Sequence, residues 1–265
     1  MSCAPPPGAA LVVDGLTIRF GGLTAIEGMS FKVMQGEVLS LIGPNGAGKT
    51  SAFNAITGYI VPDAGTVSYQ GTRLNGLKPS RIAGLGVVRT FQKTSVFLGQ
   101  TVLDNVLLGL HLASRQTPLS IILRLPWVAR EEKALAEEAR RILGFVDLGA
   151  RAHMLASALP YGELRLLEVA IALAAKPKLL LLDEPVSGMN PAETASFMST
   201  IARIRELGIT ILLVEHDMKM VMGVSDRVVC LNHGRIIADG TPAAIQANPE
   251  VIRAYLGERY VRAKG

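Results

Sequence analysis

The sequence predicts an α/β fold of the P-loop NTPase type, whose core carries an antiparallel β subdomain and an inserted helical subdomain. Three observations support this fold class. A complete phosphate-binding loop at 43–50 follows an apolar strand, and a fully apolar run at 179–182 ends in two carboxylates. Between them, residues 101–175 show helical periodicity, which indicates a helical insertion.

Composition limits the class of protein and its partners. The 265 residues, 49% of them apolar, suffice for a large domain with a deeply buried core. The net charge of +5 permits anionic partners, but no dense run of lysine and arginine occurs, and no nucleic-acid partner is expected. Cys3 and Cys230 lie far apart, which fits a reducing cytosol. We expect neither a signal peptide nor a membrane span, so if the protein works at a membrane, other chains must anchor it.

The N-terminal part should be rich in β-structure. Residues 1–10 form a lead-in of proline, alanine and glycine, and glycine-bearing turns separate three strand-like segments, whose spacing is typical of one sheet, at 11–20, 26–34 and 37–42. Phe20 ends the first segment. Its ring is a candidate for stacking on a purine, and a place in the core is the alternative.

The third segment leads into the pattern G-x-x-x-x-G-K-[ST], which here is Gly43-Pro44-Asn45-Gly46-Ala47-Gly48-Lys49-Thr50. Glycines let successive backbone N–H groups turn towards the phosphates of a nucleotide. Lys49 brings a charge to the β- and γ-phosphates, the Thr50 hydroxyl can bind Mg²⁺, and the helix begun at Ser51 points its positive end at the anion. The sequence therefore predicts a nucleoside triphosphate site.

The chain after the loop supplies a polar amide and a helical block. A helix at 51–56 and short strands at 66–70 and 87–89 lead to Gln92, which can orient water or Mg²⁺. An amphipathic helix is expected at 129–148. The apolar stretch at 119–128 belongs either to the core of this subdomain or to a contact with a membrane-embedded partner.

A second glycine-bearing turn, Pro160-Tyr161-Gly162-Glu163, should open a helix at 164–175 and form a further anion site. Beyond it, Asp183 and Glu184 follow the apolar run at the edge where α/β sheets bind ligands. Asp183 can bind Mg²⁺ through its water shell, and Glu184 can accept a proton from an attacking water. Two successive carboxylates paired with the phosphate loop favour hydrolysis.

The last third of the chain adds a candidate histidine. A strand at 211–214 runs into Glu215-His216-Asp217, so His216 lies on the same edge of the sheet and can bridge the γ-phosphate and Glu184. The remainder is interpreted as a hairpin, with strands at 227–231 and 235–238, followed by helices between 242 and 262.

The motifs along the chain are residues 43–50, Gln92, the turn at Gly162, residues 179–184, Ser187-Gly188-Met189-Asn190 and His216. Taken in this order, they resemble the complete motif set of ABC-transporter ATPase subunits. Subunits of that family have a RecA-like core. The resemblance implies that two subunits face each other head to tail. Each ATP then lies between the phosphate loop of one subunit and the glycine turn of the other. It also implies communication between the subunits through residues 187–190.

The resemblance assigns roles to the candidate residues. Phe20 matches an adenine-stacking aromatic, Gln92 joins the core to the helical subdomain, and His216 matches a switch histidine. The predicted nucleotide contacts are Phe20, Gly43, Pro44, Asn45, Gly46, Ala47, Gly48, Lys49, Thr50, Ser51, Tyr161, Gly162 and Glu163. The predicted catalytic residues are Glu184, His216 and Gln92, and the predicted Mg²⁺ ligands are Thr50, Gln92 and Asp183.

Within that family, the chain is similar to the larger ATPase of high-affinity branched-chain amino acid importers in Leu159-Pro160-Tyr161-Gly162, Glu215-His216-Asp217-Met218 and residues 251–258. This similarity implies ATP and Mg²⁺ as cofactors, a second ABC ATPase, identical or different, and two permease subunits. A substrate-binding protein would take part indirectly. The chain would lie peripherally on the cytoplasmic face of the inner (plasma) membrane. Pro160 stands where the common motif has serine, so we expect the Gly162 N–H to carry more of the anion contact.

The expected organisation is a lead-in at 1–10, a nucleotide-binding core at 11–92 and 176–240, a helical subdomain at 93–175 and a helical tail at 241–265. Two alternatives stay open: an ABC ATPase for another cargo, such as urea or an exported lipid, and a soluble ABC ATPase outside transport. A switch GTPase or P-loop kinase is disfavoured, because no Asn-Lys-x-Asp motif occurs.

Overall fold

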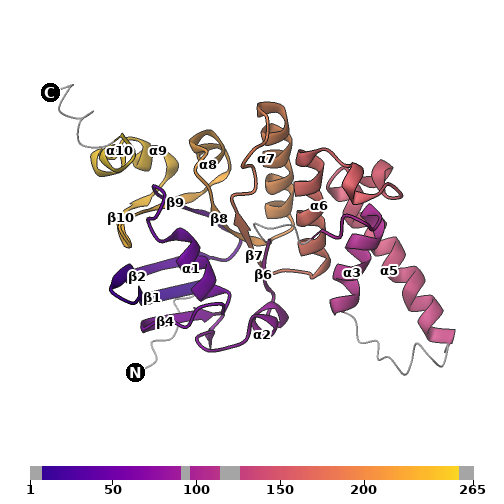
Figure 1. Ribbon diagram of the computed structural model, residues 1–265, viewed down its shortest axis with the longest axis horizontal. Coiled ribbons are helices and arrows are strands. Elements are labelled where there is room, and N and C mark those ends of the chain that lie inside the picture. Colours follow the sequence, from indigo (N-terminus) through magenta and orange to yellow (C-terminus); the bar gives the residue numbers. More distant parts are fainter. Residues whose placement is uncertain (1–7, 91–95, 114–125, 257–265) are drawn as a thin grey trace. The chain divides into compact units, whose positions relative to one another are not determined.

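The computed structural model (Figure 1) divides into two compact units, and it describes residues 8–90, 96–113 and 126–256. The core unit comprises residues 1–89, 178–187 and 198–265. The helical unit comprises residues 90–177 and 188–197. One helix, α7 (Pro191–Glu206), belongs partly to each unit.

The described part of the core unit contains a six-stranded sheet in the order β10-β9-β3-β8-β7-β6. Its strands are β3 (Val38–Ile42), β6 (Val87–Arg89), β7 (Leu179–Asp183), β8 (Thr210–Val214), β9 (Arg227–Asn232) and β10 (Arg235–Gly240). Neighbouring strands are parallel except in the β9–β10 hairpin. Every residue of β3, β7 and β8 is buried, as expected for a sheet covered on both faces.

A second, antiparallel sheet has the order β2-β1-β4-β5, with strands β1 (Ala9–Phe20), β2 (Leu23–Met34), β4 (Ala64–Tyr69) and β5 (Thr72–Arg73). The prediction of one sheet for the three N-terminal segments was wrong for the third. That segment, β3, pairs with β8 and β9 instead. The physical reason is its unbroken burial: a strand with no polar face fits the centre of the parallel sheet, not a half-exposed one.

Five helices of the core unit are described, namely α1 (Lys49–Ile56), α2 (Pro79–Gly84), α8 (Met218–Val224), α9 (Pro242–Gln246) and α10 (Pro249–Leu256). Helix α1 begins two residues earlier than expected, at the lysine of the loop. Figure 1 shows α9 and α10 next to β10, which both helices contact. The rest of the predicted helical tail lies outside the described residues.

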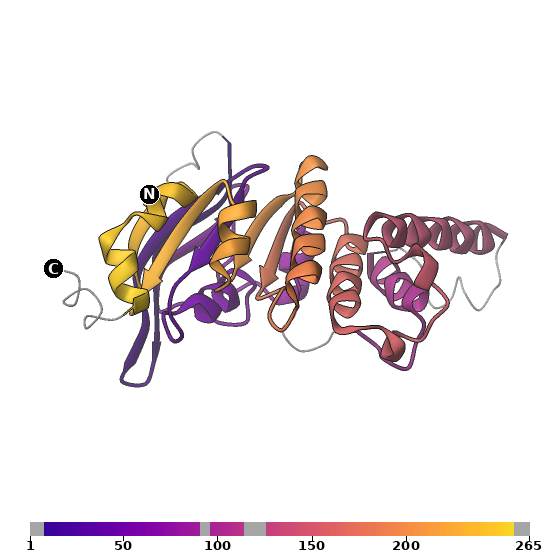
Figure 2. The ribbon, with the colours of Figure 1, turned by 90° about the horizontal axis from the view of Figure 1, so that it is seen from above.

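The helical unit is built from α3 (Val102–Ala113), α5 (Pro126–Phe145) and α6 (Tyr161–Ala174), which lie against one another in Figure 2, with the short turns η1 (Gly149–Arg151) and η2 (Ala156–Ala158). Gly109 allows α3 to approach α6 closely, since a Cβ there would lie 3.0 Å from the Ile171 carbonyl oxygen. The predicted amphipathic helix is α5, and most of the apolar stretch at 119–128 lies outside the described residues. Among the described helices, none has both the length and the apolar character to cross a bilayer.

Candidate nucleotide site

The phosphate loop is held in a conformation that only glycine adopts easily. Gly43, Gly46 and Gly48 have φ angles of +149°, +81° and +108°. A Cβ at Gly43 would lie 2.2 Å from the Leu231 carbonyl oxygen, and one at Gly48 would lie 2.7 Å from that of Ala25. The loop therefore rests directly on the backbones of β9 and β2.

The Lys49 side chain is hydrogen-bonded to the backbone of the phosphate loop. Its buried ammonium donates hydrogen bonds to the carbonyl oxygens of Gly43, at 2.6 Å, and Pro44, at 3.1 Å. Burial lowers the pKa of Lys49, while Glu184 and Asp183 oppose that shift, so the structure brings these three predicted residues within electrostatic reach. The first N–H groups of α1 lack a side-chain cap, because the N-cap is Gly48, and this leaves them available to an anion.

Asp183 ends β7 and is completely buried at its carboxylate. One oxygen, Oδ2, accepts a hydrogen bond from Arg89 Nη2 at 2.6 Å. The other, Oδ1, is buried and has no hydrogen-bond partner among the residues that the structure describes. Since buried polar atoms are almost always paired, this oxygen points to a ligand. The role of Arg89 was missed from the sequence, where an arginine at the end of a short strand carries no recognisable signal.

Glu184 follows directly, half-buried and in a left-handed backbone conformation, with φ at +47°. Its N–H donates to the Val214 carbonyl oxygen at 2.9 Å, which fixes this conformation against β8. Such strain costs on the order of 1–3 kcal/mol in a non-glycine residue and is concentrated at functional sites.

Glu215, at the end of β8, is a second residue whose role the sequence did not reveal. Its fully buried carboxylate accepts backbone N–H groups of Val186, His216 and Asp217, at 3.1, 2.9 and 3.2 Å. It thus joins the loop after Glu184 to the loop that carries His216. The His216 side chain itself is 54% exposed, with Nδ1 3.8 Å from Glu215 Oε2.

We expect Glu215→Gln to destabilise the protein by about 2 kcal/mol, because an amide nitrogen would face backbone N–H groups in a buried site. For a chain of this size the melting temperature should fall by about 4–8 °C in thermal unfolding. Glu206→Gln, at an exposed carboxylate, is the matched control and should leave it unchanged. Equal melting temperatures for the two variants would contradict this account of Glu215.

Phe20 ends β1 with half of its surface exposed, which excludes the alternative of a core phenylalanine. The ring belongs to the hairpin whose second strand, at Ala25, supports Gly48 of the loop. Phe20 is therefore available to a planar ligand bound near the loop.

The glycine turn lies in the helical unit. Helix α6 begins at Tyr161, not at Leu164 as predicted, so Gly162 and Glu163 lie in its first turn. The reason is Pro160, which serves as N-cap with an extended backbone and supplies no capping side chain. A Cβ at Gly188 would lie 3.3 Å from the Tyr161 ring, so the loop at 187–190 reaches this turn. Gln92 lies outside the described residues.

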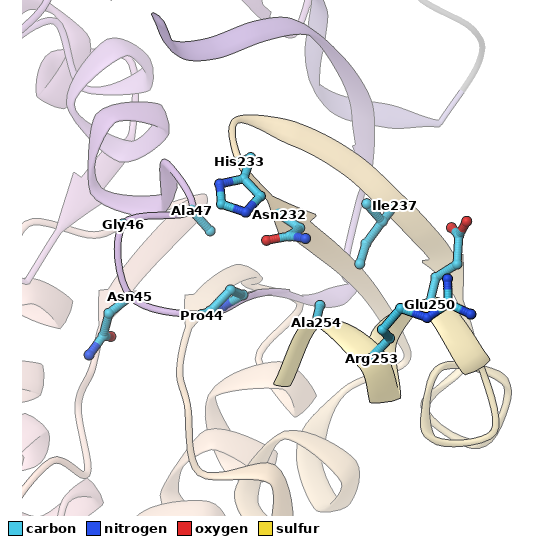
Figure 3. Close-up of a pocket in the computed structure, with 10 residues that line it drawn as sticks. All are labelled: Pro44, Asn45, Gly46, Ala47, Asn232, His233, Ile237, Glu250, Arg253 and Ala254. Atoms are coloured by element: carbon cyan, nitrogen blue, oxygen red, sulfur yellow. The ribbon is translucent and has the colours of Figure 1, made fainter. Parts of the chain in front are cut away.

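A pocket of about 570 Å³ lies beside the phosphate loop (Figure 3). Its walls are the loop, the β9–β10 turn and α10, through Pro44, Asn45, Gly46, Ala47, Asn232, His233, Ile237, Glu250, Arg253 and Ala254. Next to it, burial raises the pKa of Tyr255 to about 12, and the Gly43 backbone opposes this shift. Tyr255 of α10 also packs against the buried cluster that contains Ile42, the residue before Gly43, a contact that the sequence pattern did not predict.

Comparison with known proteins gives consistent matches. Residues 26–187 match the sequence profile described as ABC transporter, and residues 235–261 match the profile described as branched-chain amino acid ATP-binding cassette transporter. The chain is 45% identical over 249 residues to the high-affinity branched-chain amino acid transport ATP-binding protein BraF of Pseudomonas aeruginosa, covering 94% of this chain and 98% of BraF. With the same coverage, it is 44% identical to the corresponding Escherichia coli protein LivG.

Solved structures agree with the sequence comparisons. An ATP-binding cassette of an ABC transporter in its ADP conformation superimposes with a TM-score of 0.83 at 31% identity, covering 94% of this chain and 99% of that one. A nucleotide-free ATP-binding cassette gives a TM-score of 0.82 at 30% identity, with 94% and 100% covered. These similarities confirm the predicted fold class.

Proposed function

The chain belongs to the ATP-binding cassette family of ABC transporters and is an ATPase subunit, and from this premise we propose that it powers the uptake of branched-chain amino acids. We infer the cargo from the sequence identity of 44–45% to BraF and LivG, which extends over nearly the whole length of each protein. The match at residues 235–261 extends this similarity into the region of α10.

The residues present fit Mg²⁺. Asp183 Oδ1 is a buried oxygen without a partner among the described residues, and Arg89 ties Asp183 to α1, the helix on which Thr50 is exposed. Carboxylate and hydroxyl oxygens are ligands that Mg²⁺ prefers. Gln92 is proposed as a third ligand. When bound, Mg²⁺ would neutralise charge on the β- and γ-phosphates.

The proposed mechanism uses residues of the core unit to hold ATP and to move one proton. The loop N–H groups and the N-terminus of α1 bind the phosphates, and Lys49 exchanges its carbonyl partners for phosphate oxygens. Phe20 stacks on the adenine. Glu184 accepts the proton of the attacking water, and His216 positions the γ-phosphate.

A second ATPase subunit would complete the site. The turn at Tyr161, Gly162 and Glu163 opens α6, which has 14 residues and no side-chain cap, so its first N–H groups are suited to an anion. We propose that this turn faces the ATP of the opposing subunit, identical or different. ATP then closes the pair and hydrolysis reopens it.

Two permease subunits are the proposed membrane partners, with the chain lying peripherally on the cytoplasmic face of the inner membrane. Phe97, Leu98 and Leu155 of the helical unit are exposed. Ser157 N–H donates to the Leu98 carbonyl oxygen at 3.1 Å, and Thr101 pairs with Leu155, so these apolar residues gather in one region. An exposed apolar patch of this kind supports docking of a protein partner.

The test is gentle detergent extraction of membranes that carry a tagged chain, followed by mass spectrometry of the proteins that co-purify. We expect two polytopic permeases and a second ATPase, with ATP turnover stimulated by leucine, isoleucine or valine together with the binding protein. Phe97→Asp combined with Leu155→Asp should lose the permeases, while Leu207→Asp, at an exposed leucine of the core unit, should retain them. The same set of partners stimulated only by another solute would replace the cargo, and ribosomal or DNA-bound partners would overturn the transport function.

A further inference from the structure

Arg89 joins three elements of the core unit through one buried guanidinium. Its Nη2 donates to Asp183 Oδ2 of β7 at 2.6 Å, and its Nη1 donates to Asn54 Oδ1 of α1 at 2.7 Å. The guanidinium carbon also lies 5.5 Å from the centre of the Phe53 ring. Only 9% of the Arg89 side chain and none of that of Asp183 is exposed to solvent.

We propose that Arg89 is a positioning residue that directs the metal-binding oxygen of Asp183. The inference rests on the proposed Mg²⁺ site. Because Arg89 donates to Oδ2, Oδ1 is the carboxylate oxygen left open to a ligand, and this buried oxygen has no partner among the described residues. The planar guanidinium holds Nη1 and Nη2 in fixed relative positions, so its bonds to Asp183 and Asn54 restrict each other, which a flexible ammonium does not achieve.

We call the two hydrogen bonds of the Arg89 guanidinium, to Asp183 and to Asn54, the fork. The bond to Asn54 fixes the position of one proposed metal ligand, Thr50, relative to the other, Asp183. Asn54 lies on the same short helix as Thr50, one turn further along. Through Arg89, the end of β7 is therefore tied to the helix that carries Thr50. The fork holds Asp183 and the helix together before any nucleotide arrives.

The variant Arg89→Met keeps most of the side-chain length and the apolar contact with Phe53 but removes both hydrogen bonds. The Asn54 amide is then free to rotate and donate to Asp183, so the carboxylate no longer has one fixed outward oxygen. Arg89→Lys keeps the buried charge but can hold only one of the two partners.

The experiment measures Mn²⁺, as a probe for Mg²⁺, by electron paramagnetic resonance on the full-length chain with ATP. Removing a residue that orients a metal ligand typically weakens metal binding by about 10–100-fold, and we expect this range for Arg89→Met, with Arg89→Lys between it and the wild type. Binding of ATP in EDTA should not change, because Arg89 acts on the metal ligand and not on the nucleotide.

Arg227→Met is the matched control. Arg227 also bridges two carboxylates in the core unit, Glu37 at 2.8 Å and Asp239 at 2.9 Å, and it donates to the Lys32 carbonyl oxygen. Both variants should lower the melting temperature, but only Arg89→Met should weaken Mn²⁺ binding. Equal Mn²⁺ affinity in the two variants, or a wild-type affinity in Arg89→Lys, would overturn the role of the fork. A wild-type chain that binds ATP but gives no signal of protein-bound Mn²⁺ would overturn the proposed Mg²⁺ site as well.

Discussion

Replacing Glu184 with glutamine is expected to lower ATP turnover by about 10²–10⁴-fold while ATP binding is retained. Glutamine has nearly the same shape but cannot accept the proton of the attacking water. Glu184 follows β7 directly, after Asp183, and is half-buried. Its left-handed backbone, with φ at +47°, is held by the hydrogen bond to Val214, which the substitution leaves intact.

Turnover should be measured in the assembled transporter, and ATP binding by equilibrium titration of the same preparation. Glu163→Gln is not a suitable control, since this residue belongs to the proposed glycine turn. Glu206→Gln lies at the exposed end of α7 and should keep normal turnover. Near-normal turnover in Glu184→Gln would show that another group accepts the proton.

The parts of the site that could be predicted are those formed by residues that are consecutive in the sequence. The phosphate loop, Asp183 with Glu184, and His216 each follow a buried strand, and in parallel sheets the ends of neighbouring strands meet at one edge. The order of strands, with β8 between β3 and β7, places these three segments at that edge. Local pattern therefore sufficed to place these three segments at one edge of the sheet.

The supporting residues could not be predicted in the same way, because their roles depend on partners far along the chain. Arg89 and Asp183 are 94 positions apart, and Glu215 bonds to Val186 across 29 positions. Tyr255, near the far end of the described chain, packs against the buried cluster that contains Ile42, the residue before the loop. No spacing rule in the sequence encodes such contacts, and each becomes visible only when burial and hydrogen bonding are known.

The misplacement of β3 has a related cause. The spacing of turns groups a strand with its neighbours in sequence, whereas an unbroken apolar run favours the centre of a sheet that is covered on both faces. In the structure β3 lies in the six-stranded sheet, so burial of the apolar run determines its position. The sequence predicts the start of α6 three residues too late, because a segment with proline and glycine, such as 160–163, is typical of a turn. In the structure, Pro160 supplies the boundary and Gly162 lies inside the helix.

The second large effect is expected for Gly43→Ala, which should weaken ATP binding by about 10²-fold and destabilise the fold by about 1–3 kcal/mol. The new Cβ would lie 2.2 Å from the Leu231 carbonyl oxygen, and the φ angle of +149° is unfavourable for alanine. The backbone must move by about 1 Å to relieve this contact, since ordinary contacts of a Cβ begin near 3.4 Å. That shift carries away the Gly43 carbonyl oxygen to which Lys49 is bonded.

Gly76→Ala separates the backbone strain of a positive φ angle from the displacement caused by the steric contact of the new Cβ. Gly76 also has a left-handed φ angle, +77°, but a Cβ there meets no atom within 4 Å, and the residue lies outside the loop. Its substitution should therefore cost only the backbone strain, seen as a lower melting temperature with unchanged ATP affinity. If Gly43→Ala bound ATP as well as Gly76→Ala does, the loop would tolerate displacement, and its rigid seating on β9 would not be what positions Lys49 for the phosphates.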